Sequence, residues 1–404
     1  MSIKQWEREY LRDYAKEQLE ISNLPIMAER ARLWTLHNDC KIDRPMVHFE
    51  MHPVLDREFF RPIKCETPEA RDLEKRLEFN IHNHLMVDDD RVVTPDYQVD
   101  IRAGIIPFDM EPKRENTDGL GFHIVPQIEN LEDMSLIKPS PMIFNCKQRL
   151  EHRDLAEDIF GDILDVRLSM SGFYFCMTNE IVQRMSMENM FFAMYDTPNE
   201  FKAMMDSLSN DYIAFIRELE KRELLVGNNK NDWVAQGTFG FTEQLPDRPK
   251  TSKDCWGFMD SQETVAISSE MFGEFVFPYY QKIADNFGRL VYGCCEPVDP
   301  FFDKYISKFN NLSKLSISAW ANEEYMGERL AGTNIIYQRK PSPNYVGVGK
   351  NLDEEAFRAH IKKTVDATKK CKLEITFRDV VSLEGNISKP RRAVEIAREE
   401  LEKR

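Results

Sequence analysis

The chain has 404 residues, of which 42% are hydrophobic and 30% are charged, and its formal net charge is −15. Hydrophobic residues interleaved with charged ones exclude a disordered chain, and the acidity argues against a nucleic-acid-binding protein, which needs clustered Lys and Arg. No run of about 18 apolar residues occurs, so we expect no membrane span.

The N-terminal stretch is charged throughout and has no apolar core, which argues against a signal peptide. We therefore expect a cytoplasmic protein. Its eight cysteines would then be free thiols or metal ligands, because a reducing compartment disfavours disulfide bonds.

Apolar residues recur at helical spacing over 3–35, which predicts a helix, and we interpret residues 1–42 as an N-terminal helical extension. The segment 43–55 predicts a strand, and 96–108 predicts a second one. Residues 109–160 are rich in Pro, Asn and Asp, which predicts an irregular insertion of loops and short elements over one end of the fold.

Two helices with a break at Thr197 are predicted within 179–225, after a strand over 164–175. An extended segment over 232–241 and a strand over 255–268 follow. The C-terminal part then alternates: the predicted helices are 269–287, 299–309, 322–330, 353–370 and 389–404, and the predicted strands are 289–293, 314–320, 334–340 and 372–380.

Such alternation predicts a parallel sheet covered by helices. With about eight strand candidates, an α/β fold closed into a (β/α)8 TIM barrel is favoured over an open doubly wound sheet, and we expect residues 43–404 to form one barrel domain. No glycine-rich phosphate-binding loop follows any strand, which argues against a nucleotide-binding Rossmann fold.

Polar side chains share one face of each of the first two predicted strands, because residues spaced by two point the same way. These residues are His48, Glu50 and His52 in the first strand, and Gln98, Asp100 and Arg102 in the second. If these faces line the barrel interior, they mark a cavity. The alternatives are an outward polar face and a buried layer of ion pairs.

Charged residues also stand where predicted strands end, which is the end at which parallel barrels place their active sites. "FMDSQE" places Asp260 and Glu263 there, and "EITFRD" places Arg378 and Asp379. Single acids at strand ends are often helix caps or solvated loop residues instead. Our candidate catalytic residues are Asp260, Glu263, His52 and Arg378.

"VYGCCEPVDP" (291–300) brings two adjacent cysteines and Glu296 to the end of another predicted strand. Successive strand residues point to opposite sides, so Cys294 and Cys295 cannot both face the cavity unless the strand has ended. A vicinal disulfide is rare, and no C-x-x-C redox motif is present. Buried free thiols are one interpretation; a zinc site formed by a thiolate and carboxylates from other strand ends is the other.

The stretch "FMDSQETVAISSEMFGEFVFPYYQKI" (258–283) resembles the uroporphyrinogen decarboxylase superfamily, in which an Asp-Ser pair at a strand end precedes an "SP..F..F..PY..KI" helix. The matching residues are Asp260, Ser261, Ser268, Phe272, Phe275, Pro278, Tyr279 and Ile283. The order of the later strands is similar too, and the resemblance covers roughly 250–404, more thinly 45–200. It implies a (β/α)8 barrel.

Two activities are known in that superfamily, namely cofactor-free decarboxylation of uroporphyrinogen and zinc-dependent methyl transfer to or from a corrinoid protein. The decarboxylases carry an early "RQAGR" motif and a "GHG" last strand, whereas this chain reads "FEMHP" and "FRDV" at these places. Both departures favour the corrinoid-dependent methyltransferase branch.

The zinc methyltransferases carry His-x-Cys on the fifth strand and a Cys on the eighth. By this resemblance their first cysteine falls on Cys295, their histidine on Gly293 and their last cysteine near Asp379. One of three ligands is therefore kept. Cys294, Glu296, Glu263, Asp379 or the histidines of the first strand would replace the lost donors, so the implied metal residues are Cys295, Cys294, Glu296 and Asp379.

The implied function is methyl transfer between a small, for example aromatic, methyl donor and a separate corrinoid protein, as in O-demethylation. Zn²⁺ would act as a Lewis acid on the donor's heteroatom. Tyr292, Trp320 and Tyr337 would stack on the donor or the corrinoid, or they serve packing alone. A homodimer is an open alternative to a monomer.

Two other functions stay open. One is a metal-free lyase of the decarboxylase type that clamps carboxylates with arginines and a lysine. Its clamps would be Arg102, Arg378, Arg339 or Lys340. The other is a non-catalytic barrel that only binds a tetrapyrrole or a corrinoid protein.

Overall fold

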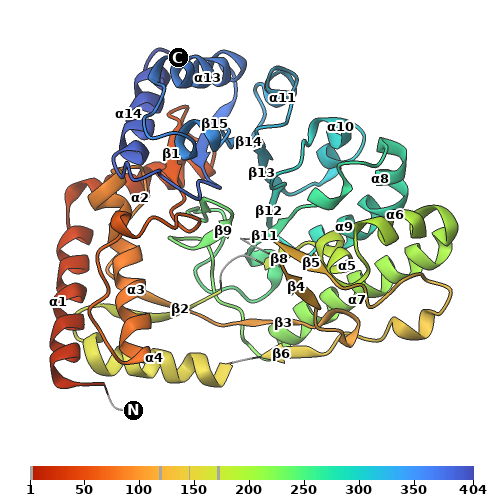
Figure 1. Cartoon of the computed structure of the whole chain (residues 1–404), viewed down its shortest axis with the longest axis horizontal. Helices are drawn as coiled ribbons and strands as arrows, with labels where there is room; N and C mark the ends of the chain where they lie inside the picture. Colours follow the sequence, from red (N-terminus) through yellow and green to blue (C-terminus); the bar gives the residue numbers. More distant parts are fainter. Residues whose placement is uncertain (1–2, 118–120, 145, 171–172) are drawn as a thin grey trace.

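A seven-stranded parallel sheet forms the centre of the molecule (Figure 1). The computed structural model describes residues 3–117, 121–144, 146–170 and 173–404. The strands lie in the order β1-β15-β14-β13-β12-β11-β8, and each neighbouring pair is parallel. Their bounds are β1 Met46–Phe49, β8 Phe173–Phe175, β11 Trp256–Met259, β12 Arg289–Tyr292, β13 Leu312–Ile317, β14 Ile336–Arg339 and β15 Lys372–Phe377.

Each strand from β11 to β14 is followed by at least one helix, which returns the chain to the start of the next strand, and a last helix follows β15 (Figure 1). The helices of the C-terminal half are α8 Ser269–Phe275, α9 Phe277–Ala284, α10 Asp299–Phe302, α11 Glu323–Leu330, α12 Asn344–Gly347, α13 Glu354–Ala367 and α14 Lys389–Leu401. Those of the N-terminal half are α1 Gln5–Ser22, α2 Pro25–Asn38, α3 Pro68–His82, α4 Cys146–Phe160, α5 Met177–Met185, α6 Met187–Asp196 and α7 Pro198–Lys221. Among the described residues, no helix is long and apolar enough to cross a membrane.

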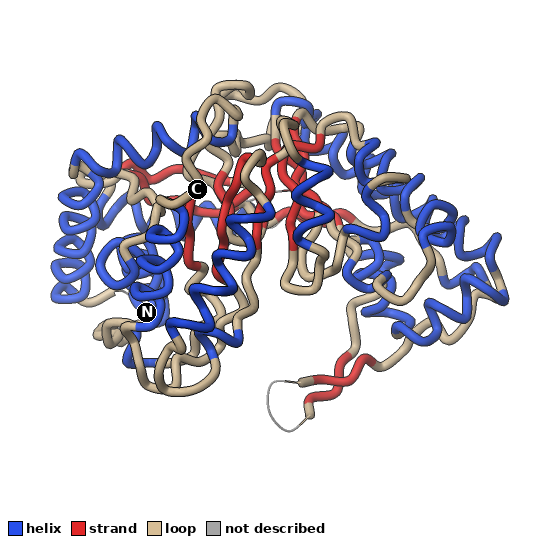
Figure 2. Tube along the Cα trace, turned by 90° about the horizontal axis from the view of Figure 1, so that it is seen from above, coloured by secondary structure: helices blue, strands red, loops and turns tan. Residues whose placement is uncertain are grey.

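In the described parts of the chain, four two-stranded sheets accompany the central one. They pair β2 Asp96–Asp100 with β7 Asp165–Ser169 in parallel, and, antiparallel, β3 Ala103–Ile105 with β6 Met142–Phe144, β4 Arg114–Asn116 with β5 Phe122–Ile124, and β9 Trp233–Ala235 with β10 Thr238–Phe239. The β4–β5 pair projects from the body of the molecule (Figure 2).

The predicted parallel sheet is confirmed, and the architecture is like that of a TIM barrel. Within the described residues no ladder joins β1 to β8, so closure of the barrel stays a prediction. The segment predicted as one strand over 96–108 is two short strands, β2 and β3, and neither belongs to the central sheet. Likewise the strand predicted over 164–175 is two strands, β7 and β8, and of these only β8 belongs to the central sheet.

Five helix predictions need correction. In the C-terminal half, the helix expected over 269–287 is two helices separated at Val276, and the one expected over 299–309 ends at Phe302. The other three lie in the N-terminal half. The helix expected over 3–35 is broken before Pro25, because the residue that precedes a proline is disfavoured in helical conformation and proline fits the first helical turn. The insertion expected to be irregular contains the long helix α4. The break at Thr197 is confirmed, but a further break at Ser186 gives three helices instead of two.

Hydrogen bonds join the end of the N-terminal helix α2 to the rest of the chain. The Asn38 side chain, at the end of α2, donates hydrogen bonds to the carbonyls of Phe239 at 2.9 Å and Phe241 at 2.8 Å. Arg289 of β12 donates to the Asn38 carbonyl at 2.6 Å. Residues 1–42, predicted as an extension, therefore include a helix whose end contacts one end of the central sheet.

The two faces of the central sheet differ in character, because side chains alternate along each strand. Apolar side chains on one face pack against the helices: Leu315, Ile317, Tyr337, Leu373 and Ile375 belong to this layer. Polar side chains on the opposite face are equally buried: Lys314, Ser316, Gln338, Glu374 and Thr376. A polar face can be buried only if each group finds a partner.

The β9–β10 hairpin supplies partners to this polar face. Its Gln236 carbonyl accepts a hydrogen bond from the Gln338 amide at 3.1 Å, and its Gly237 carbonyl accepts one from the Thr376 hydroxyl at 3.3 Å. Gly237 has φ +73°, and a Cβ there would lie 2.1 Å from the Thr376 methyl group. Only glycine allows this turn to approach the sheet so closely.

A buried ion pair lies beneath the hairpin. Lys314 Nζ of β13 is 2.9 Å from Glu374 Oε2 of β15, and both side chains are fully buried. Lys314 also donates to the Thr238 hydroxyl of the hairpin at 2.5 Å. Burial opposes ionisation of Glu374, but Lys314, His37 and Thr238 together outweigh it and lower the pKa of Glu374 to about 2.

Replacing Lys314 should destabilise the fold in a pH-dependent way. Because its folded pKa is below the ordinary value of 4.5, Glu374 contributes stability above that pH and loses it as the pH falls toward about 2. Lys314→Met leaves a buried carboxylate without its cation, so the free energy of unfolding near neutral pH should drop by about 3–5 kcal/mol. The deficit should shrink in acid, as urea titrations at several pH values would show.

Lys304→Met is the matched control, since Lys304 pairs with Glu270 on the exposed surface. Its loss should stay under about 1 kcal/mol. Equal losses in the two variants would contradict a stabilising role for the buried pair.

Candidate active site

The register of two neighbouring strands brings a cysteine and an aspartate together. In the β8–β11 ladder Phe175 lies opposite Met259, and both strands end there. The next residues, Cys176 and Asp260, therefore leave the same edge of the sheet side by side. Glu263 joins them from the short turn that follows β11.

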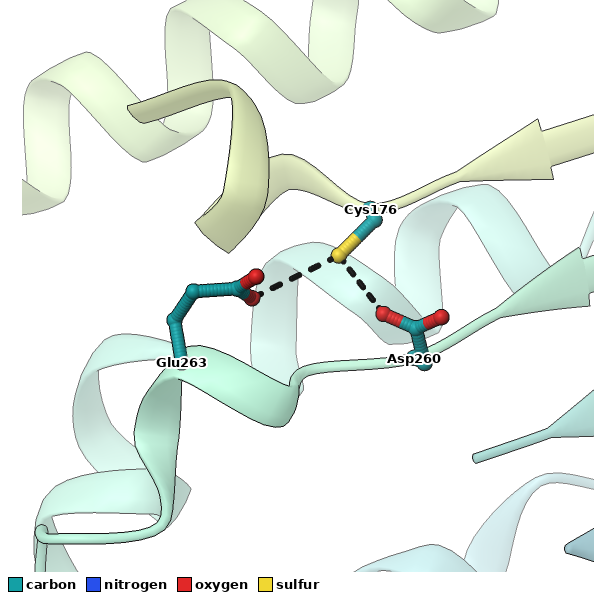
Figure 3. A group of neighbouring side chains, drawn as sticks. All are labelled: Cys176, Asp260 and Glu263. Atoms are coloured by element: carbon teal, nitrogen blue, oxygen red, sulfur yellow. Dashed lines mark hydrogen bonds between the residues drawn. The ribbon is translucent and has the colours of Figure 1, made fainter. Parts of the chain in front are cut away.

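These three side chains converge (Figure 3). Cys176 Sγ lies 2.7 Å from Asp260 Oδ1 and 3.6 Å from Glu263 Oε2. All three residues are buried, with Glu263 exposed by 4% and Asp260 by 0%. We call them the Cys176 cluster.

Hydrogen bonds from neighbouring elements fix both carboxylates. They run from Tyr174 to Asp260 Oδ2 at 3.0 Å, from Asn179 to Glu263 Oε1 at 2.7 Å and from Thr178 to Glu263 Oε2 at 2.8 Å. Tyr280 of α9 donates to the Asp260 carbonyl at 2.8 Å, which holds the backbone at the strand end. The cluster is thus set by strand β8, helix α5, the turn after β11 and helix α9.

Burial dominates the protonation of the cluster. It raises the pKa of the Cys176 thiol well above its usual value, and the nearby Asp260 carboxylate adds to this effect. Burial also raises the pKa of Asp260 well above its usual value, with Glu296 and Cys294 contributing. The cluster consists of two carboxyl groups and a thiol and includes no basic side chain. A bound cation would therefore stabilise the ionised forms of these groups.

The donor atoms of the cluster suit a metal ion. Within the part of the chain that the structure describes, this is the group of three metal-ligating side chains whose donor atoms all lie within 4.8 Å of one another. Tetrahedral zinc with usual bond lengths separates sulfur and oxygen ligands by about 3.6 Å. The Cys176–Glu263 distance already has this value, and the Cys176 thiol donates to Asp260 across a shorter distance.

A pair of cysteines, Cys294 and Cys295, lies at the end of β12, where the sequence predicts a metal site. Cys294 Sγ is 3.3 Å from Cys295 Sγ and donates to Gln236 Oε1 at 2.6 Å. The contact between the two thiols raises the pKa of Cys294 and lowers that of Cys295. Both line a cavity of about 100 Å³ with Lys340 and Trp320.

The other predicted metal ligands lie around this pair in different ways. Asp379 Oδ2 is 3.8 Å from Cys295 Sγ. Glu296 points elsewhere: its carboxylate accepts backbone hydrogen bonds from Ser261 at 3.0 Å and from Cys294 at 2.9 Å. Gly293, where the resemblance places a histidine, has φ +93°, a conformation that favours glycine over any other residue.

A cavity of about 450 Å³ lies between the Cys176 cluster and the Cys294–Cys295 pair. Tyr174, which contacts Asp260, and Gln236, which contacts Cys294, both line it. Glu50 and His52, two of the three polar residues predicted to share a face, line it from the loop after β1. The third, His48, does not line it: its ring is fully buried, 2.8 Å from Asp89.

The remaining predicted residues are distributed between the cavity side and the helix side. Arg378 lies 3.3 Å from Glu50 and 3.0 Å from Asp379, facing the 100 Å³ cavity. Tyr292 and Tyr337 are fully buried in the layer that packs against helices, because they alternate with the cavity-facing residues of their strands. Trp320 is 75% exposed at the rim of the smaller cavity.

Cys176, Tyr174 and Thr178 were not predicted from the sequence as site residues. The available signal was a cysteine directly after the apolar run "FYF" of β8. That signal alone could not select Cys176, because its proximity to Asp260 follows from the β8–β11 register.

Comparison with known proteins finds a similar fold but no matching sequence. No protein-family model matches this chain, and no curated protein sequence matches it. Among solved structures, a methyltransferase from Methanosarcina mazei is similar, with a TM-score of 0.51 at 10% sequence identity, over 91% of this chain and 97% of that chain. The chain shares the fold of that protein. At this identity the likeness establishes the fold alone.

Cys295 should be the most readily alkylated of the described cysteines. Its pKa is lowered by Cys294, whereas burial raises the pKa of Cys255 to about 12 and that of Cys176 well above its usual value. Brief treatment with iodoacetamide near neutral pH, followed by peptide mass spectrometry, should modify Cys295 first.

Cys294→Ala removes the contact that stabilises the Cys295 thiolate, so alkylation of Cys295 should slow several-fold near neutral pH. Cys371→Ala is the control, because Cys371 donates to the Gly327 carbonyl and is not among the residues around the pair. An unchanged rate in Cys294→Ala would contradict the coupling of the two thiols.

Proposed function

We propose that the protein is a metal-dependent methyltransferase that moves a methyl group between a small methylated substrate and a corrinoid carried by a separate protein. The observation that carries this proposal is the buried Cys176 cluster at the carboxyl edge of the sheet, beside the 450 Å³ cavity. The fold shared with a methyltransferase supports it.

The cluster would hold zinc through Cys176, Asp260 and Glu263. Three protein ligands and an open fourth position are typical of catalytic zinc, whereas structural sites use four. We prefer this set to the predicted one around Cys295, because Glu296 is already engaged by two backbone N–H groups. Zinc in this position would supply a Lewis acid for the heteroatom that carries the methyl group.

The protein's own residues would orient and enclose this site. Tyr174 holds the Asp260 carboxylate from the cavity side, and Thr178 with Asn179 hold Glu263 from α5. These bonds leave the carboxylates little freedom to turn, which keeps the donor set in one arrangement. The burial of the cluster excludes bulk water from the reacting heteroatom.

A closed (β/α)8 barrel would accommodate this function, with β2 beside β1 and with β7 and β8 counted as one barrel position, which together with β11 to β15 makes eight positions. The hydrogen bond from the Asp90 amide to the Val47 carbonyl at 2.9 Å already places the segment before β2 beside β1. That placement supports closure on the β1 side.

A metal-free lyase is the second candidate, and one observation favours it. A neighbouring cavity of about 660 Å³ is lined by four cationic side chains, although the chain as a whole is acidic. These residues are Lys75, Arg76, Arg102 and Arg149. Such a lining suits a substrate with several carboxylates. Arg339, another predicted clamp, instead pairs with Glu323 at 2.7 Å in the buried interior.

Zinc content tests the ligand set directly. Protein purified without chelators should contain about one zinc per chain, and Cys176→Ser or Asp260→Asn should lose most of it by plasma mass spectrometry. Cys295→Ser should keep its zinc. The reverse pattern, with zinc lost only in Cys295→Ser, would move the site to the end of β12. Circular dichroism of each variant checks folding.

Methyl transfer is tested with zinc-loaded protein, free cobalamin reduced to the Co(I) state and a panel of methyl ethers, thioethers and methylamines. Accumulation of methylcobalamin, followed by absorbance, is expected with at least one donor and should fall by about a hundredfold or more in Cys176→Ser. Release of CO₂ from uroporphyrinogen without added metal would favour the lyase. Tight cobalamin binding with no turnover on any donor would favour a binding protein.

A further inference from the structure

The lining of the 450 Å³ cavity holds more carboxylates than cationic side chains, although Arg378 lies 3.3 Å from Glu50 and Arg167 lies 3.4 Å from Asp232. Its lining includes three carboxylates, from Glu50, Asp100 and Asp232. Among the described residues that line it, Arg76 is the one cationic side chain, since burial lowers the pKa of His52 and keeps its ring neutral near neutral pH. An anionic ligand would meet repulsion here, and a cationic one would be attracted.

Two of these carboxylates have an oxygen that accepts no hydrogen bond. Glu50 Oε2 and Asp232 Oδ2 are both buried without a hydrogen-bond partner, and the residues are 8% and 2% exposed. Arg378 approaches Glu50 Oε2 to 3.3 Å without hydrogen-bond geometry. Arg167 reaches only the other Asp232 oxygen, Oδ1, at 3.4 Å. Buried carboxylate oxygens normally have donors, so both point to a donor that a ligand brings.

Aromatic side chains complete the lining. Tyr174 and Phe258 stack with ring centroids 4.7 Å apart, and both line the cavity with Trp233. Aromatic faces attract cations and apolar groups alike. Tyr174 also connects this lining to the Cys176 cluster through its hydrogen bond to Asp260.

We propose that the cavity binds a substrate with a primary ammonium group, whose N–H groups donate to Glu50 Oε2 and Asp232 Oδ2. The methyl-bearing heteroatom at the other end of the substrate extends past Tyr174 toward the Cys176 cluster. The substrate class is then a small methyl ether or thioether that also carries an amine. The role of the methyl-bearing end rests on the proposed function, whereas ammonium binding needs no turnover.

The test compares two ligands of equal size and opposite character. Isothermal titration calorimetry on the full chain measures 2-methoxyethylammonium and its neutral isostere 1-methoxypropane, in which a methyl group replaces the ammonium. The ammonium compound should bind about tenfold or more tightly than the isostere. Glu50→Gln and Asp232→Asn should each remove most of this preference.

Glu270→Gln is the matched control, because this exposed carboxylate pairs with Lys304 and does not line the cavity. It should leave the preference unchanged. Thermal unfolding checks the variants, and the comparison of the two ligands on the unaltered protein decides the matter even if a variant fails to fold. Equal affinity for the two ligands, no measurable binding of either, or an unchanged preference in both cavity variants would overturn the proposal.

The outcome is separable from that of the proposed function. Selective binding of the ammonium compound without methyl transfer would support the cavity assignment and count against the methyltransferase. Methyl transfer from neutral ethers with no preference for the amine would do the opposite.

Discussion

The fit of the β9–β10 hairpin against the polar face of the central sheet is the constraint on which the rest of the structure depends. A parallel sheet of this kind usually fills its inner face with layers of branched apolar side chains. Here Lys314, Gln338, Glu374 and Thr376 occupy that face, and the hairpin accepts hydrogen bonds from Lys314, Gln338 and Thr376. Because the hairpin fills one part of the interior, the space between its tip and Tyr174 stays open as the cavity.

The tip of the hairpin also lies between the Cys294–Cys295 pair and the cavity that adjoins the Cys176 cluster. Gln236 contacts Cys294 on one side of the cavity, and Tyr174 contacts Asp260 on the other. The two groups differ in what they are suited to do. The Cys176 cluster is fully buried and has three donors for a cation, whereas Cys295 is partly exposed, has a lowered pKa and lies near Lys340 and Arg378. The first suits metal binding, and the second suits a reactive thiolate.

The sequence predicts much of the C-terminal half, because hydrophobic periodicity is clearest where short strands alternate with helices. The strands expected over 289–293 and 334–340 correspond to β12 and β14. The N-terminal half is less predictable, since 96–108 alternates like a core strand yet pairs only in small sheets outside the central one. Asp260 and Glu263 could be selected as strand-end acids, but Cys176 could not, because its role depends on a ladder between strands more than 80 residues apart. For Tyr292 the sequence left stacking and packing open, and strand parity places it among the residues packed against the helices.

The distribution of charge determines how a ligand would lie in the two neighbouring cavities. The chain is acidic as a whole, yet the 660 Å³ cavity gathers cationic side chains and the adjoining 450 Å³ cavity gathers carboxylates. Arg76 and Asp100 line both cavities, so the cationic lining of one adjoins the carboxylates of the other. A ligand that spans them would carry its positive group toward Glu50 and Asp232 and any negative group toward Arg76. Such an arrangement fixes the direction in which a substrate lies, and this direction brings its remaining part toward Tyr174 and the Cys176 cluster.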